Sequence, residues 1–450
     1  MQCDESVENN HNSNRRRFLQ TGGVAIGSLA TGSISSVQAA SGEMPAKSAI
    51  VILLQGGCSQ LDTWDMKPAA PSEYRGEFDS IATTLPGYRV CEHLPRLAAR
   101  TDRFNVLRSV HHATPSHEAA IHWVLTGYDY PGANVTTKNR NNQPSVGSFV
   151  AKLRGPSRPG LPAYVCVPDK GQLGDRVRYA GAHFLGMAFD PFESGPVPAD
   201  ATAPFQLPPY LVMSPTIDVG RFQDRQSLLQ RLDNISRESD ASGTMNGLDQ
   251  FRRTALDMVS YPVTRDAFDL SQETPATRQR YGSHKFGQRA LLSRRLVEAG
   301  VPFTLVNFSD NQDWDTHVGN FASMKNTLLP CLDQAVATLL DDLIERGLLD
   351  STLVAIVSEF GRTPKINKDA GRDHWSDVFS VVLTGGGLKT GQILGASNPR
   401  AQIPQDRPIH YNDVLATIYR QLGVATDRVF LHEGRPVPVL YHGTSIQELI

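Results

Sequence analysis

The sequence has few cysteines, no excess of basic residues and no long apolar run, and each absence narrows the class of protein. Its five cysteines are scattered along 450 residues, and none stands in a CxxC or another zinc-type spacing. The formal net charge is −2, so composition gives no support for nucleic-acid binding. Hydrophobic residues make up 40% of the chain and charged residues 20%, which argues against global disorder and allows a sizeable core.

The first 39 residues have the pattern of an export signal. Asn14–Gln20 contains three consecutive arginines and resembles a twin-arginine (Tat) motif, and Val37–Ala39 offers the small residues that a signal peptidase reads. Thr21–Ala30 between them is too short and too weakly apolar to span a membrane. We therefore expect a Tat signal peptide over residues 1–39. The alternative is a polar tail with a chance arginine cluster.

Export through the Tat pathway has three consequences for the mature chain. The Tat translocase is its expected partner during export, and its expected location is the periplasm or the outside of the cell. We expect no transmembrane segment in the mature chain. Because the Tat route carries folded proteins, it suits a protein that acquires a metal in the cytoplasm.

Short apolar runs alternate with helical patterns after the signal, which predicts one α/β domain over residues 40–450. A mainly parallel central sheet with helices on both faces is the expected architecture. The expected strands are Ser48–Leu54, Phe104–Val110, Leu161–Val167, Phe303–Phe308, Thr352–Val357 and Phe379–Thr384. The expected helices include Leu291–Ala299, Phe321–Arg346 with a kink or break at Pro330, and Tyr411–Leu422.

The segment around residues 172–290 interrupts this alternation. Gln172–Pro215 is dense in Gly and Pro and predicts an irregular insertion that forms a wall or lid of the site. Phe222–Gln288 is expected to be largely helical, with its many charged residues on a solvated face. Gly132–Gly147 is rich in Asn, Thr and Gly and predicts a loop.

Residues that can bind metal follow three of the expected strands. Carboxyl ends of strands in open α/β sheets usually bind ligands, and carboxylates with imidazoles are common metal ligands there. The candidate metal ligands are Asp62, Asp313, Asp315, His317, Glu359 and His374. The alternative is that these residues are ordinary helix caps and polar loop residues.

A second candidate region is the turn His111–Glu118, which leads into an Ala-rich helical stretch that ends at Gly127. The amino terminus of a helix favours a bound anion, so Thr114 or Ser116 is a candidate nucleophile facing a phosphate or sulfate. His112 and His117 lie beside them. The alternative is that the hydroxyls only cap the helix and the histidines are surface groups.

The order of these features resembles the alkaline phosphatase–sulfatase superfamily. The Asp313-x-x-x-His317 loop is similar to the metal loop of cofactor-independent phosphoglycerate mutases, and Thr352–Gly361 is similar to the sulfatase strand that ends in Ser-Asp-His-Gly. The whole mature chain resembles more closely an uncharacterised bacterial family of sulfatase-like proteins, domain of unknown function 1501. Its motifs here are Gly56-Gly57-x-Ser59-x-x-Asp62-Thr63, Trp314-Asp315-Thr316-His317, Ser358-Glu359-Phe360-Gly361-Arg362-Thr363-Pro364 and Gly371-Arg372-Asp373-His374-Trp375.

The resemblance implies a metal-dependent hydrolase of a phosphate or sulfate ester, on an anionic small molecule or a polysaccharide. Divalent ions (Zn, Ca, Mg or Mn) would polarise the ester, and His112 or His117 would activate the nucleophile. Arg362 or Arg372 would bind the anionic group bidentately.

Three positions depart from the pattern. Gln55 stands where the superfamily has its first metal-binding Asp, Phe360 where it has a His, and Ala113 where sulfatases have their modified cysteine. The alternative function is therefore a non-catalytic exported binding or assembly protein that keeps the fold.

Overall fold

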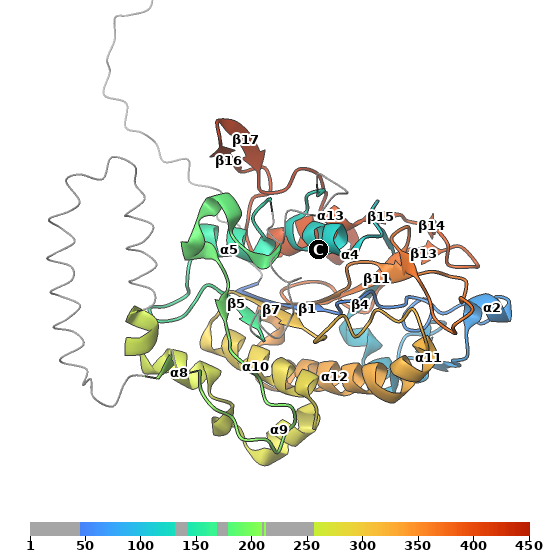
Figure 1. Ribbon diagram of the computed structural model, residues 1–450, viewed down its shortest axis with the longest axis horizontal. Helices are drawn as coiled ribbons and strands as arrows, with labels where there is room; N and C mark the ends of the chain where they lie inside the picture. Colours follow the sequence, from blue (N-terminus) through green and yellow to red (C-terminus); the bar gives the residue numbers. More distant parts are fainter. Residues whose placement is uncertain (1–45, 131–141, 169–178, 209–210, 213–255) are drawn as a thin grey trace, which may run out of the picture. The chain divides into compact units, whose positions relative to one another are not determined.

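The computed structural model describes residues 46–130, 142–168, 179–208, 211–212 and 256–450, and these residues form a nine-stranded sheet with helices on both faces (Figure 1). The expected signal peptide lies outside the described residues. The strands of the sheet are β1 (Ser48–Leu53), β4 (Asn105–His111), β5 (Tyr164–Val167), β6 (Phe192–Glu193), β7 (Phe303–Asn307), β8 (Thr352–Val357), β11 (Phe379–Thr384), β12 (Ile393–Leu394) and β15 (Ile409–His410). Their order is β12-β4-β11-β8-β1-β7-β5-β6, with β15 beside β4.

The sheet is mainly parallel, so the predicted fold class is confirmed. β8, β1, β7, β5 and β6 run parallel to one another. β11 is reversed, because it pairs antiparallel with both β8 and β4. The carboxyl ends of β1, β4, β7 and β8 therefore lie at one edge of the sheet, whereas the three glycines after β11 lie at the other.

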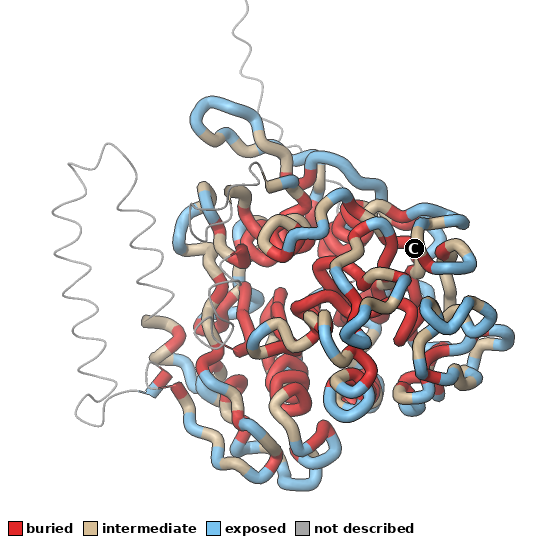
Figure 2. Tube along the Cα trace, turned by 45° about the vertical axis from the view of Figure 1, so that its right-hand side comes forward, coloured by how far each residue is buried: buried red, intermediate tan, exposed pale blue. Residues whose placement is uncertain are grey.

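Helices cover the sheet in two layers (Figure 1). One layer contains α10 (Lys285–Ala299) and α12 (Leu329–Glu345), and the other contains α4 (His117–Thr126), α5 (Val146–Arg154) and α13 (Tyr411–Gln421). Alternate residues of β1 enter different cores: Ile50 and Ile52 pack in the first, and Val51 and Leu53 in the second. The strand is buried on both faces, as a near-continuous apolar run requires (Figure 2).

The expected helix Phe321–Arg346 is interrupted where the proline predicts it. The chain forms α11 (Asn320–Ser323), then a π-helical turn over Met324–Leu328, and then α12. Pro330 stands in the first turn of α12, where its missing N–H leaves no hydrogen bond unmade. α10 begins at Lys285, within the segment Phe222–Gln288 that is expected to be largely helical, and runs through the expected Leu291–Ala299 to Gly300. His284 caps it by accepting a hydrogen bond from the Gly287 N–H.

The described part of the insertion is irregular, as expected, but it adds the edge strand β6 that the sequence did not predict. Residues 256–290 form short helices, among them α8 (Pro262–Phe268) and α9 (Pro275–Tyr281). The loop predicted over Gly132–Gly147 is wrong at its end, because Ser145 caps α5 and the helix begins at Val146. Residues 131–141, 169–178 and 213–255 of these predictions lie outside the described residues.

Smaller elements complete the described chain: α2 (Ser72–Arg75), β2 (Ser80–Ala82), β3 (Arg89–Cys91), α3 (Pro95–Ala98), β9 (Gly361–Arg362), β10 (His374–Trp375), β13 (Ala396–Ser397), β14 (Pro404–Asp406), β16 (Val429–His432) and β17 (Arg435–Pro438). β9 and β10 pair antiparallel and place Arg362 opposite His374. Within the described ranges, none of the helices has both the length and the apolarity needed to cross a membrane.

Candidate metal centre

The loops that follow β1, β4, β7 and β8 meet at the carboxyl edge of the sheet, and glycines allow them to approach closely. Gly56 has φ +122°, and a Cβ there would lie 2.4 Å from the backbone nitrogen of Asp315. A Cβ on Gly371 would lie 1.8 Å from the carbonyl oxygen of His317. Any larger side chain at either position would push the β7 loop out of place.

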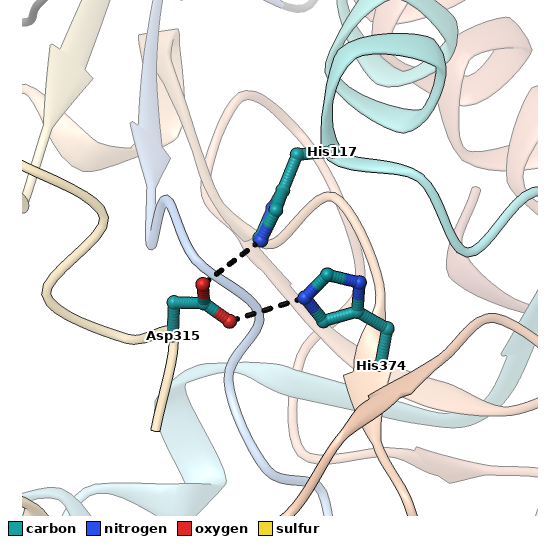
Figure 3. Close-up of side chains that lie close together, drawn as sticks. All are labelled: His117, Asp315 and His374. Carbon is teal, nitrogen blue, oxygen red and sulfur yellow. Dashed lines mark hydrogen bonds and ion pairs between the residues drawn. The ribbon is translucent and has the colours of Figure 1, made fainter. Parts of the chain in front are cut away.

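Asp315 lies at the centre of a cluster of histidines (Figure 3). Its Oδ2 is 3.2 Å from Nε2 of His117, and its Oδ1 is 3.1 Å from Nε2 of His374. One ligand atom from each of these three residues lies within 4.8 Å of the others. Nε2 of His317 adds a fourth group, because it is 3.0 Å from Asp315 Oδ1 and 3.0 Å from His374 Nε2.

Each imidazole is held through its other ring nitrogen by an oxygen that can only accept a hydrogen bond. The three Nδ1 pairs are His117 with Glu359 Oε1 at 2.9 Å, His317 with Asp373 Oδ1 at 2.6 Å, and His374 with the Pro115 carbonyl at 2.8 Å. A carbonyl or an ionised carboxylate accepts, so Nδ1 carries the hydrogen in each ring. In the neutral rings, the Nε2 lone pairs therefore face Asp315, which is the usual geometry of metal-binding histidines.

This arrangement fits a divalent metal ion. Nε2 atoms 3.0 Å apart that both face a carboxylate need positive charge between them, supplied either by protons or by a cation. Two imidazoles and one carboxylate form a set that suits zinc and is also found with other transition metals, and three protein ligands leave a coordination position open. The residues that would hold the ion are His117, Asp315 and His374, with His317 beside them at the exposed side.

The electrostatics of the metal-free cluster are those of a tight ion-pair network. Burial alone would raise the pKa of Asp315, but hydrogen bonds from His117 and His374 and the charge of Arg362 hold it well below its usual range. Burial would lower the pKa of His117, but its hydrogen bonds to Asp315 and Glu359 raise it to about 9. Without a metal, His117 is therefore a buried cation between two carboxylates.

The cluster is closed on one side and open on the other. The His117 side chain is 9% exposed, whereas that of His317 is 41% exposed. Phe360 forms part of the closed wall, with its ring centroid 4.9 Å from that of His117 and 4.6 Å from that of His374. The cluster is therefore accessible to solvent on the side of His317.

Arg362 is a buried cation within the cluster. Its Nη2 donates to Asp315 Oδ1 at 2.6 Å, its Nε to the Gly57 carbonyl at 2.8 Å and its Nη1 to the Arg372 carbonyl at 3.2 Å. Burial lowers the pKa of the guanidinium, and the Asp315 carboxylate partly offsets this. All three guanidinium nitrogens donate hydrogen bonds to the protein, so Arg362 neutralises Asp315. The sequence-based prediction that Arg362 binds an anionic substrate bidentately is therefore not supported by its contacts.

Two predicted metal ligands lie beside the cluster without joining it. Oε1 of Glu359 accepts hydrogen bonds from His117 Nδ1 and from the Gly56 N–H at 2.7 Å and so orients the His117 ring, whereas its Oε2 is buried without a hydrogen-bond partner. Asp313 accepts from the Asp310 N–H and lies 3.5 Å from Lys285 Nζ. The i, i+4 spacing of Asp313 and His317 does not bring them together, because the β7 loop directs Asp315 inward instead.

Asp62 and Arg372, predicted as metal ligand and anion binder, are partners of each other. Both are fully buried, with Arg372 Nε 2.7 Å from Asp62 Oδ2 and Nη2 3.1 Å from Oδ1. Ser59 Oγ and Asn320 Nδ2 also donate to Asp62 Oδ2, at 2.6 Å and 2.9 Å. The carboxylate has its charge balanced and its lone pairs used, and the structure does not bring it into the Asp315 cluster.

His112 is also engaged with the protein instead of with a substrate. Its Nδ1 accepts from the Thr114 N–H at 3.2 Å, so its Nε2 donates to the Glu359 carbonyl at 2.5 Å. Burial lowers the pKa of His112 to about 4, so the ring is neutral. Its plane stacks on Trp123. His112 therefore holds the β8 loop in place.

The two candidate nucleophiles lie at the rim, with Thr114 half-buried and Ser116 exposed. Ser116 is the N-cap residue of α4, but its side chain makes no capping hydrogen bond. Its Oγ instead donates to Oε2 of Glu118 at 3.3 Å. Ser116 stands between Pro115 and His117, both of which touch the cluster.

Sequence reasoning missed the partners that fix the ligands. Asp373 holds His317, the Pro115 carbonyl holds His374, and Glu118 accepts from Ser116. Asp373 could have been found, because it precedes His374 in the same motif. The Pro115 carbonyl could not, since a backbone contact leaves no residue-type signal.

The chain belongs to the family described as "Protein of unknown function (DUF1501)", whose profile matches residues 46–450. The match covers nearly the whole chain after the expected signal, so the predicted family membership is confirmed. A search of curated proteins found no match.

Several solved structures are similar to this chain at low identity. A phosphonate monoester hydrolase from Silicibacter pomeroyi is 11% identical with a TM-score of 0.38, and the match covers 89% of this chain and 75% of that one. The PsFucS1 sulfatase from Pseudoalteromonas sp. is 12% identical with a TM-score of 0.36, over 89% and 73%. TAB5 alkaline phosphatase with bound Mg is 10% identical with a TM-score of 0.35, over 78% and 94%. At these TM-scores the likeness transfers neither activity nor substrate.

Proposed function

We propose that the protein is a metal-dependent hydrolase of a phosphate or sulfate ester. The observation that supports this most strongly is the convergence of His117, His317 and His374 on Asp315, with each Nδ1 already held by an oxygen. Structural metal sites are closed, whereas hydrolytic sites keep a position open, and the exposed side of His317 supports the second kind. The ester class follows from the sequence motifs.

The residues around the cluster have separate roles in this proposal. A divalent ion held by the cluster would polarise the ester and stabilise charge on its oxygens. Ser116 is the nucleophile, and Glu118 takes its proton, since the Oγ already donates to that carboxylate at 3.3 Å. Thr114 is the alternative nucleophile. Glu359 and Asp373 orient their histidines, and Arg362 keeps Asp315 ionised.

Metal content followed by ester turnover tests the proposal. The purified protein is expected to hold a divalent metal by mass spectrometry and to cleave p-nitrophenyl phosphate or p-nitrophenyl sulfate. Asp315→Asn is expected to lose both properties, whereas Ser116→Ala is expected to keep the metal and lose turnover. Bound metal with no turnover on either ester would contradict the hydrolase, and turnover that survives Ser116→Ala would remove only that nucleophile.

The ion-pair network supports a second candidate, a non-catalytic exported binding or assembly protein. Arg362 and a protonated His117 already balance the charges of Asp315 and Glu359 without any metal. Such a network can serve only to hold four loops together. A purified protein that binds no divalent ion, and whose unfolding is unaffected by chelators, would favour this function.

Export to the periplasm or beyond through the Tat pathway is part of the same proposal. It rests on the three arginines at positions 15–17 and the small residues before the expected cleavage after Ala39. Replacing Arg16 and Arg17 together with lysine is expected to leave the protein inside the cell. Fractionation with an epitope tag at the carboxyl end measures this, and equal export of both forms would contradict a Tat signal.

A further inference from the structure

Arg362 is held more firmly than a residue needed only for charge balance. Its side chain is fully buried and bonds to three loops, as described above. The side-chain amide of Gln60 forms two hydrogen bonds with the backbone of Arg362. Its Nε2 donates to the Arg362 carbonyl at 3.1 Å, and its Oε1 accepts from the Arg362 N–H at 3.0 Å. The guanidinium is therefore a fixed positive charge 2.6 Å from the central carboxylate.

Among the residues that the structure describes, the groups around Asp315 offer one set of three metal ligands, and a second ion would have only Asp315 Oδ1 and the buried, unpaired Oε2 of Glu359. Gln55 bonds through its Oε1 to the side-chain amide of Asn307 at 2.7 Å, and Phe360 packs against the histidine rings. Asp62 is neutralised by Arg372.

We propose that the site holds a single divalent ion, because the Arg362 guanidinium takes the place that a second cation would need. Asp315 Oδ1 has two lone-pair directions, and Nη2 of Arg362 uses one of them. A second ion bridged by Asp315 would meet this fixed charge at close range, in surroundings that screen it poorly. The inference rests on the metal centre of the proposed function and adds its stoichiometry and the residue that sets it.

The stoichiometry of the native protein tests the proposal directly. The protein is stripped with a chelator, saturated with Zn²⁺, Mn²⁺ or Mg²⁺ in turn, freed of excess metal and analysed by mass spectrometry and titration calorimetry. One equivalent per chain is the expected result with the best-bound ion. Two equivalents would overturn the single-ion site and leave the hydrolase proposal standing, whereas none with any ion would remove both.

Two variants test whether Arg362 is the cause. Arg362→Gln removes the charge and frees Asp315 Oδ1, so the ratio of metal to protein is expected to rise from one to two. Arg362→Lys keeps the charge and is expected to remain at one. A folded Arg362→Gln protein that still binds one equivalent would overturn the role of the guanidinium. If Arg362→Gln does not fold, Arg362→Lys provides the test, and two equivalents bound to Arg362→Lys would overturn the role of the positive charge. The number of ions per chain is decided by the native protein in either case.

Discussion

Two aspartate–arginine pairs, each with a buried arginine, lie at the carboxyl edge of the sheet, and they differ in the groups that surround each carboxylate. Asp62 is completed by Arg372, Ser59 and Asn320, whose hydrogen atoms point at it. Asp315 is completed by Arg362 and by imidazoles whose Nδ1 hydrogens are used elsewhere. The first pair needs nothing more, whereas the second needs protons or a metal.

The arginine side chains of both pairs are 0% exposed, but the Asp62 side chain is 0% exposed and that of Asp315 is 23% exposed. The partners also separate the pairs, because hydroxyl and amide donors saturate the Asp62 carboxylate, whereas the imidazole lone pairs that face Asp315 can share a cation with it. We infer that the Asp62 pair stabilises the fold and the Asp315 pair serves the site.

Asp315→Asn is expected to have the largest effect, because it acts on both metal binding and stability. A structural zinc site with four ligands binds with about 10–16 kcal/mol, which is roughly 2.5–4 kcal/mol for each ligand, so the loss of Asp315 should weaken binding on the order of 10²–10³-fold. The variant also leaves Arg362 buried without its carboxylate, which costs roughly 3–5 kcal/mol. Titration calorimetry with Zn²⁺ and urea unfolding measure the two terms.

Asp313→Asn is the matched control for this variant. It makes the same chemical change two residues away in the same loop, where the carboxylate faces Lys285. Metal affinity should stay within about twofold and stability within about 0.5 kcal/mol, as for ordinary surface substitutions. Equal losses of affinity in the two variants would show that the ion is not held by Asp315.

Asp62→Asn is expected to lower the free energy of unfolding by about 3–5 kcal/mol, because Arg372 stays buried without a partner. Metal stoichiometry should not change in the fraction that remains folded. Urea unfolding at two salt concentrations measures the loss, which salt should screen little in a buried pair. Loss of metal without loss of stability would reverse the assignment of the two pairs.

The contrast extends to two histidines of one loop. His112 is neutral with its pKa near 4, and His117 is charged with its pKa near 9. The pKa of His112 in the folded chain lies below its unfolded value of about 6.5. Between these two pKa values His112 is therefore protonated in the unfolded chain and neutral in the folded chain. The stability it contributes is complete above about pH 6.5 and is lost as the pH falls towards 4, by about 3 kcal/mol.

His112→Gln removes this titration. The difference in unfolding free energy between the wild type and the variant should therefore shrink between pH 7 and pH 4.5, as urea unfolding at each pH would measure. A difference that is constant over this range would mean that His112 takes up its proton at the same pH in the folded and the unfolded chain, and that the folded ring is charged at the acidic end of the range. The stacking on Trp123 would then be a cation–π contact.

Glu359→Gln is expected to weaken metal binding by about 10–100-fold, the usual effect of losing a partner of a ligand. The amide keeps the shape of the side chain and can still accept from the Gly56 N–H, but it no longer provides a charged acceptor for His117. Competition against a zinc dye measures the change. A loss as large as that of Asp315→Asn would mean that Glu359 binds the ion directly.

The six longer strands of the sheet and most of the cluster could be predicted from the sequence, because both follow from local pattern, whereas the two-residue strands β6, β12 and β15 could not. The apolar runs of β1, β7 and β8 have to be buried on both faces of the sheet. Because these strands are parallel, the residues that follow them all lie at the carboxyl edge of the sheet. That is why Asp315, His317 and His374 could be named as candidates before any coordinates. The direction of β11 could not be predicted, because an apolar run of this length suits a parallel strand and an antiparallel strand equally well.

The roles of individual carboxylates depend on contacts that no local pattern records. Asp62 meets Arg372 across 310 residues of chain, and His117 meets Glu359 across 242. Asp313 and Asp315 differ only in which way one turn of loop directs them. Residue type therefore identified what could bind a metal, and tertiary packing decided which groups face it.

Ser116→Ala is expected to have the smallest effect on stability and metal affinity. A serine that caps a helix contributes about 1 kcal/mol, but Ser116 makes no side-chain cap bond, so its loss should cost less than about 0.5 kcal/mol. Ser145→Ala is the control, because Oγ of Ser145 accepts from the Ser148 N–H at the start of α5. Thermal unfolding of both variants should separate them. If Ser116→Ala lowers the stability as much as Ser145→Ala does, the Ser116 hydroxyl stabilises the fold. Ser116 would then have a structural role, as the residues around Asp62 do.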